Sequence, residues 1–223
     1  MPDLIDILSN FVKKDTLCVR PSSESVDWGG PGAVLNIGMN DERCSHLSKY
    51  IGKKAAAELY FRFIQAYSVN VARLDPDVFD HMTDTNGNSV SAALTAYKDE
   101  MDENFPQSIE HQLSEVLRSM ARAWEGTSAR LLREAKGAPA DAGLGLVIQK
   151  MAFGVGDGES GSGVLQLVNS DTGQSQITGR YLRQSQGRES LSEKQGTLFL
   201  TLDTRGPSLE TEEPRIFRDL INK

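Results

Sequence analysis

The sequence predicts an α+β fold, in which a helix-rich front half is followed by a sheet-rich back. Between residues 42 and 67 the apolar residues recur at steps of three and four, the period of a helix with one buried face. A Gly/Ala/Pro linker at 137–145 marks a change, because runs of β type and turn residues follow it. These runs span 144–153, 164–168, 177–182 and 198–202. Since helices and strands occupy separate parts of the chain, separate lobes are expected.

The other elements follow from the same patterns. Residues 17–19 are a short apolar run that predicts a buried strand, and 22–32 form a loop with four Gly or Pro residues. Asn86-Gly87 indicates a turn. The expected helices are 3–13, 42–67, a short one beginning at Asp75-Pro76, 92–101, 109–124 and a closing helix from Pro214.

Composition and charge disfavour several classes of protein. The 223 residues carry a net charge of −7 without a basic stripe, so a nucleic-acid partner is not expected. The longest apolar run is too short to cross a bilayer, and the first ten residues lack the basic start of a secretion signal. The two cysteines, Cys18 and Cys44, form no CxxC pair. A cytoplasmic protein with no membrane contact is therefore expected.

The segment Gly154–Gly163 is the most conspicuous local feature. Its five glycines could form a backbone cradle for phosphate, but it lacks the Gly-Lys-Ser/Thr ending of a P-loop. It also lies between two runs of β type. A hairpin loop is the favoured interpretation, since glycine is the usual residue of turns.

The remaining polar motifs are weaker. Arg20 closes a strand and opens the Gly/Pro loop, where it is either an anion ligand or a surface charge. Residues 84–88 resemble a calcium loop, but the glycine is misplaced and Thr95 stands at the twelfth position. None of the three histidines has a second ligand at metal spacing. No catalytic residue and no metal ligand is therefore assigned.

Several segments together resemble pyruvate phosphate dikinase and phosphoenolpyruvate synthase, in the N-terminal nucleotide-binding region of the ATP-grasp kind. The resemblance covers about residues 15–191 in one collinear order. The matching segments are Val19-Arg20, Asn36–Asp41, Tyr60–Tyr67, Trp124, Arg133, Gln149–Gly154, Ser160–Val164, Asn169, Thr172-Gly173, Gly179, Tyr181-Leu182 and Gln186-Gly187.

The chain also departs from the family pattern. The family's lysine-containing segment before the Val-Arg strand is missing, as are the phosphohistidine domain and the pyruvate barrel. The family's arginine in Phe-Thr-Arg-Asn-Pro is lost in Gln166–Ser170, and Arg180 stands where the family has a glutamate that holds the nucleotide metal. An arginine there repels magnesium, yet it could contact phosphate directly.

The resemblance implies a partial ATP-grasp-like architecture with a helical subdomain between two sheet-containing lobes. Residues 1–38 and 108–145 would be a remnant of the first lobe, 39–107 the helical subdomain, and 146–223 the second lobe. It also implies four nucleotide-binding residues, Arg20, Gln149, Gln186 and Arg180. ATP is the implied ligand, whereas a role for magnesium is doubtful.

Three functions are compatible with these features. The leading one is a vestigial or non-catalytic nucleotide-binding module, which would act with a protein partner that supplies the missing lobe. The second is an ATP-dependent phosphotransferase subunit whose site is completed in trans. The third is a structural interaction protein with a closed ligand cleft.

Overall fold

A computed structural model of the chain describes residues 15–79, 82, 89–156, 158–187, 196–201 and 205–222. The chain divides into two compact units, Met1–Met151 and Ala152–Lys223, and each is described by itself. The helix expected at 3–13 and the turn expected at Asn86-Gly87 lie outside the described residues.

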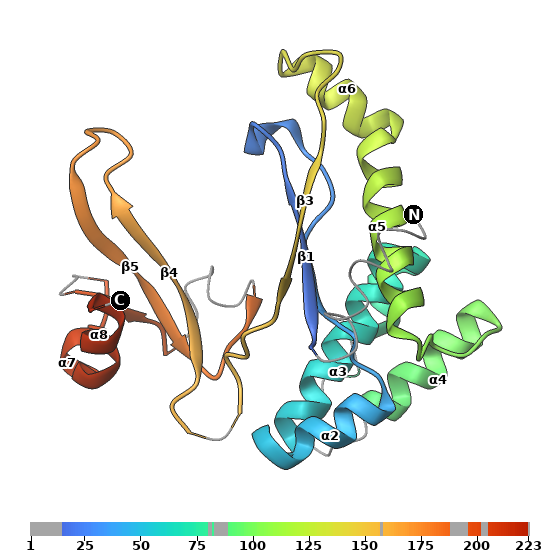
Figure 1. Cartoon of the computed structure of the whole chain (residues 1–223), viewed down its shortest axis with the longest axis horizontal. Helices are drawn as coiled ribbons and strands as arrows, with labels where there is room; N and C mark the ends of the chain where they lie inside the picture. The colour runs from blue at the N-terminus through green and yellow to red at the C-terminus, as the bar shows by residue number, and fades with distance from the viewer. Residues whose placement is uncertain are drawn as a thin grey trace. The chain divides into compact units, whose positions relative to one another are not determined.

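The first unit contains a three-stranded antiparallel sheet. Its strands are β1 (Leu17–Ser22), β2 (Val34–Ile37) and β3 (Gly145–Lys150), in the order β2-β1-β3. Leu17, Val19 and Ile37 have no exposed surface. Helix α5 (Ile109–Glu125) runs alongside this sheet in Figure 1. Cys18, on the opposite face from Leu17 and Val19, is only 2% exposed, so both faces of β1 are buried at this end, whereas Arg20 further along the strand is exposed.

Helices make up the rest of this unit. They are η1 (Val26–Trp28), α2 (Asp41–Ile51), α3 (Lys53–Tyr67), η2 (Ser68–Ala72), η3 (Pro76–Phe79), α4 (Ser89–Met101), α5 (Ile109–Glu125) and α6 (Thr127–Ala135). The single helix expected over 42–67 is instead two helices. Gly52, between them, has a φ of 84°, a backbone conformation that no helix can continue through.

The core of the first unit is an aromatic cluster where α3, α4 and the segment before α5 meet. Phe105 packs edge-on against Phe63, Tyr67 and Tyr97, with ring centroids 5.2–5.8 Å apart. The buried stripe predicted on α3 is confirmed, because Leu59, Phe63 and Ile64 have no exposed surface. The helical spacing therefore identified the core face of α3 correctly.

The second unit contains the other three-stranded antiparallel sheet. Its elements are β4 (Gly161–Val168), β5 (Ser175–Arg183), β6 (Leu198–Phe199), α7 (Leu209–Glu212) and α8 (Pro214–Ile221), with strand order β4-β5-β6. Leu198, Leu200 and Leu209 form a small core. Tyr181, Ile216 and Phe217 pack against that core. The core of this unit is therefore covered by α8, the helix predicted to begin at Pro214.

The predicted hairpin at the Gly-rich segment is wrong. β3 pairs with β1, and β4 pairs with β5, so the strands before and after this segment belong to different sheets. β3 thus lies in the first unit, although the sequence placed residues from 146 onward in the second lobe. The physical reason is that β3 matches β1 over six consecutive residues, a ladder that the sequence pattern could not reveal.

The α+β class predicted from the sequence is confirmed. The described residues hold two small antiparallel sheets and seven α-helices. Among the helices of these residues, none is both long and apolar enough to cross a membrane.

Candidate functional site

Two of the four predicted nucleotide-binding residues, Arg20 and Gln149, share one face of the first sheet. Cys18 of β1 is directly opposite Gln149 of β3, and Arg20 is two residues beyond Cys18 on the same strand. Opposed residues of an antiparallel pair share a face, as do residues two apart on a strand. Arg20 and Gln149 are both exposed. A guanidinium and an amide on one open face can together donate hydrogen bonds to phosphate oxygens.

Cys18 lies between these two residues. Burial raises the pKa of the Cys18 thiol, while the positive charge of Arg20 and a hydrogen bond with Gln149 act in the opposite direction. The thiol is therefore held neutral and packed. Its hydrogen bond with Gln149 gives that amide a structural contact on the same face.

The other two predicted residues, Arg180 and Gln186, belong to the second unit. Arg180 is in the middle of β5, opposite Val164 of β4 and Phe199 of β6. A Cβ on Gly163 would lie 2.2 Å from the Arg180 carbonyl oxygen, so the absence of a side chain there allows the strands to pair. Gln186 follows β5 and is buried. The structure thus supports Arg180 on a rigid strand and packs Gln186 inside its unit.

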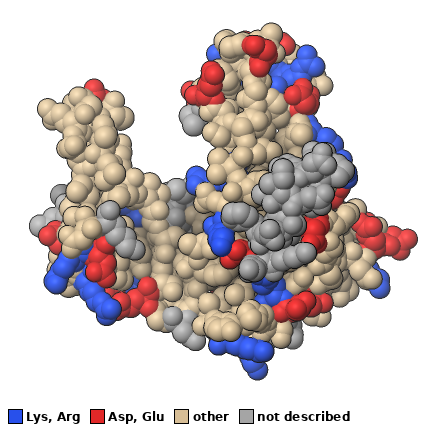
Figure 2. Space-filling view, viewed as in Figure 1, with Lys and Arg blue, Asp and Glu red and all other residues tan. Residues whose placement is uncertain are grey.

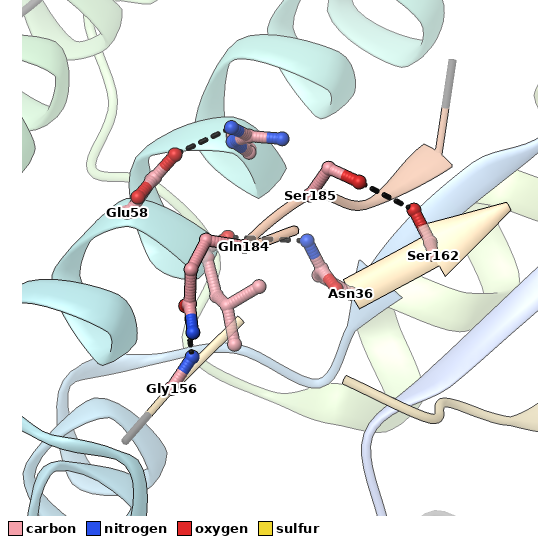
Figure 3. Close-up of polar contacts among 8 residues, drawn as sticks. Asn36, Glu58, Gly156, Ser162, Gln184 and Ser185 are labelled. Carbon is pink, nitrogen blue, oxygen red and sulfur yellow. Dashed lines mark hydrogen bonds and ion pairs between the residues drawn. The ribbon is translucent and has the colours of Figure 1, made fainter. Parts of the chain in front are cut away.

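The Gly-rich segment is held by a residue that the sequence did not single out. The Gln184 side chain accepts from the Gly156 amide at 3.0 Å and donates to the Gly158 carbonyl at 3.0 Å, as Figure 3 shows for the first bond. Ser160 donates its amide to the same Gly158 carbonyl. Two of the amides that a phosphate cradle would use are therefore occupied within the segment.

The start of β4 is fixed by a second contact in Figure 3. The Ser162 and Ser185 hydroxyls are 2.8 Å apart, and Ser185 also donates to the Leu182 carbonyl. A Cβ on Gly154 would be 2.0 Å from the Ser185 carbonyl oxygen. Position 154 therefore has no room for a side chain, and the Ser162 hydroxyl is used in a hydrogen bond within the unit.

The motif Asn36–Asp41 is anchored by Gln112, another residue that the sequence did not single out. Gln112 is fully buried on α5 and accepts from the Gly38 amide at 2.9 Å. It donates to the carbonyls of Met39 and Pro106. The sequence held one signal for this role of Gln112, which is its place on the apolar face of the predicted helix 109–124. A polar side chain on such a face needs hydrogen-bond partners. The motif therefore forms a corner between β2 and α2 that is held by hydrogen bonds to Gln112.

Trp124 and Arg133 have a structural contact. The Arg133 guanidinium lies 3.8 Å from the centre of the Trp124 ring and donates to the Trp124 carbonyl at 2.8 Å. A Cβ on Gly30 would touch the same ring at 3.4 Å. The Gly/Pro loop is thus ordered by packing on α5.

No metal centre is found in the described part of the chain, where no three His, Cys, Asp or Glu side chains come together. His81 and the segment 84–88, considered as a calcium loop, lie outside the described residues. Charged side chains of both signs are interspersed over the face in Figure 2.

Comparison with known proteins identifies relatives over most of the chain. It is 31% identical to pyruvate, phosphate dikinase of Clostridium symbiosum over 190 residues, which are 77% of this chain and 22% of that protein. It is 29% identical to the enzyme of Rhizobium meliloti over 227 aligned residues, covering 91% of this chain and 25% of that protein. This chain is a partial, pyruvate phosphate dikinase-like region. The chloroplastic pyruvate, phosphate dikinase 1 of Zea mays is 27% identical over 78% of the chain.

The chain spans about a quarter of the length of the dikinases that it matches. No protein-family model matches it. Several segments that carried the resemblance to the dikinase, such as Asn36–Asp41 and the Trp124–Arg133 pair, hold the fold together. Kinship with the dikinase therefore does not by itself identify a working nucleotide site.

Proposed function

We propose that this chain is a nucleotide-binding module derived from pyruvate phosphate dikinase, which does not transfer phosphate by itself. The observation that carries the proposal is the face shared by β1 and β3, where the exposed Arg20 and Gln149 lie diagonally across the ladder from each other. Both residues match segments of the dikinase. Their donors suit the oxygens of a polyphosphate. We assign the two sheets to a partial ATP-grasp-like architecture.

Arg180 is the reason for proposing binding without catalysis. In the dikinase pattern an acidic metal ligand stands at this position. Phosphoryl transfer of this kind needs a metal that bridges the phosphates and keeps the reacting atoms in line. A guanidinium neutralises phosphate charge with two parallel hydrogen bonds, but it repels the metal. ATP binding at Arg180 should therefore be modest in affinity, weakened by salt, and indifferent to magnesium or slightly weakened by it.

The test is a calorimetric titration of ATP into wild type and Arg180→Glu, each in EDTA and in magnesium. Wild type should bind in EDTA, whereas Arg180→Glu should bind more tightly when magnesium is added. Arg215→Glu, an exposed position on α8, makes the same change of charge and serves as the control. It should leave the magnesium dependence of wild type unaltered.

The outcomes separate the alternatives. A strict need for magnesium in wild type would contradict the role given to Arg180. Turnover of ATP would support a phosphotransferase subunit completed in trans, and no binding under any condition would support a structural interaction protein. We place the module in the cytoplasm and expect a partner protein to supply the missing lobe.

A further inference from the structure

The first unit contains a cavity that is separate from the face of β1 and β3 bearing Arg20 and Gln149. Its volume is about 380 Å³, within the range of small-molecule sites. Three segments far apart in the sequence border it. They are the Gly/Pro loop at Gly30–Gly32, the end of the helical stretch at Val69–Arg73, and the side of α5 from Val116 to Ala123.

The floor of the cavity is apolar and buried, whereas Asn70 and Arg73 at its border are exposed. Val34, Val116 and Met120 line it and are nearly or fully buried, so they form its floor. Ser119 of α5 donates its hydroxyl to the Asn70 carbonyl at 2.5 Å, which ties the helix to the facing segment. This hydrogen bond and the buried floor hold α5 and the facing segment together around the cavity.

A π-helical turn forms one side. Residues Ser68–Ala72 adopt this wide turn, and the amides of both Arg73 and Leu74 donate to the Ser68 carbonyl. Arg73 ends the turn with a φ of 67°, a conformation that a residue other than glycine seldom adopts. Strained residues and π turns are enriched at functional sites. Val69, Asn70, Val71 and Arg73 all border the cavity, which shows that the end of the helix faces it.

The charge of the lining residues indicates which kind of ligand the cavity suits. Arg73 is the one charged residue among those that line the cavity, and none of them is acidic. Within the described part of the chain, no carboxylate is paired with the Arg73 guanidinium. Apolar walls with one arginine suit a ligand that has an apolar body and one carboxylate.

We propose that this cavity is a binding site for small monocarboxylates, with the carboxylate held by Arg73 and the hydrocarbon part against Val34, Val116 and Met120. The site is distinct from the proposed nucleotide site, because its lining includes neither Arg20 nor Gln149.

Hexanoate is a suitable probe, and hexanamide is its uncharged match. In ligand-observed NMR titrations of the full chain, hexanoate should bind saturably and hexanamide about tenfold more weakly. Arg73→Gln should weaken hexanoate by a similar factor and leave hexanamide unchanged. Ala123→Leu, which extends a side chain of the lining into the cavity, should weaken both ligands.

The control is Arg130→Gln, which removes an exposed charge on α6 outside the cavity and should change nothing. Circular dichroism verifies that each variant is folded, and Ala123→Leu keeps the test decisive if Arg73→Gln unfolds. Absence of saturable hexanoate binding overturns the proposal, as does binding that neither variant alters. ATP affinity should be the same in wild type and Arg73→Gln, so this test can fail without touching the nucleotide proposal.

Discussion

At the scale of single residues, glutamines do much of the positioning in this chain. Gln112 satisfies three backbone groups at the corner between β2 and α2, and Gln184 holds the Gly-rich segment. A buried amide that lost its partners would leave groups unsatisfied at a cost of about 1–3 kcal/mol each. These contacts show that segments resembling a nucleotide site are held by hydrogen bonds within the chain.

Phe63 provides the residue-scale prediction. Its side chain is fully buried and packs edge-on against Tyr67 and Phe105. Phe63→Ala should lower the free energy of unfolding by roughly 3–5 kcal/mol, measured by urea denaturation. Tyr50→Ala removes an aromatic ring that is 69% exposed, so it should stay within about 0.5 kcal/mol of wild type. A loss under about half a kcal/mol for Phe63→Ala would mean that the face of α3 is misassigned.

At the scale of elements, β4 and β5 pair as closely as two backbones allow. Gly179 has a φ of 155°, and a Cβ there would lie 1.9 Å from the Val164 carbonyl oxygen. The outer part of this ribbon exposes Leu165, Leu167 and Ile177 and shows hardly any charged atoms in Figure 2. The stability of the second unit therefore depends on tight strand pairing near α8.

Gly179→Ala should break that pairing. The expected loss is more than about 2 kcal/mol, because backbone atoms cannot move aside cheaply. Gly173→Ala is the matched control in the same hairpin, since its φ is 70° but its Cβ would meet no atom. It should cost about 1 kcal/mol. Thermal melts followed by circular dichroism compare the two, and equal losses would contradict the close approach of the strands.

The aromatic cluster between α3 and α4 gives a pH prediction. Burial, followed by the nearby Glu103 carboxylate, raises the pKa of Tyr97 from 10 to about 12. Burial raises the pKa of Tyr60 and Tyr67 as well. A folded-state pKa above the unfolded value means that stability is fully present below pH 10 and is lost as the pH rises toward about 12.

Urea denaturation at a series of alkaline pH values measures this loss. The free energy of unfolding should fall steadily above about pH 10, together with a rise in tyrosinate absorbance. Tyr97→Phe should flatten part of the slope. A constant free energy of unfolding through this range would show that the ring hydroxyls are not shielded from water.

At the scale of the whole molecule, the sequence predicted the α+β class, the core face of α3 and the kinship with the dikinase. It missed the break at Gly52, because Ile51 and Ala55 continue the helical period across the glycine. It also mistook the Gly154–Gly163 segment for a hairpin, since strand partners depend on distant residues such as those of β1. The sequence also did not predict that Gln186, one of the four expected site residues, is buried.

The central claim is that this dikinase-like chain still binds a nucleotide through the face of β1 and β3 that bears Arg20 and Gln149. The most direct measurement is an equilibrium titration of ATP into the full chain in EDTA, for wild type and Arg20→Gln. Arg20 is exposed in the middle of β1, so this change should leave the fold intact. Saturable binding that Arg20→Gln weakens by about tenfold or more is the predicted result. Absence of saturable binding, or binding that Arg20→Gln leaves unchanged, would contradict the account.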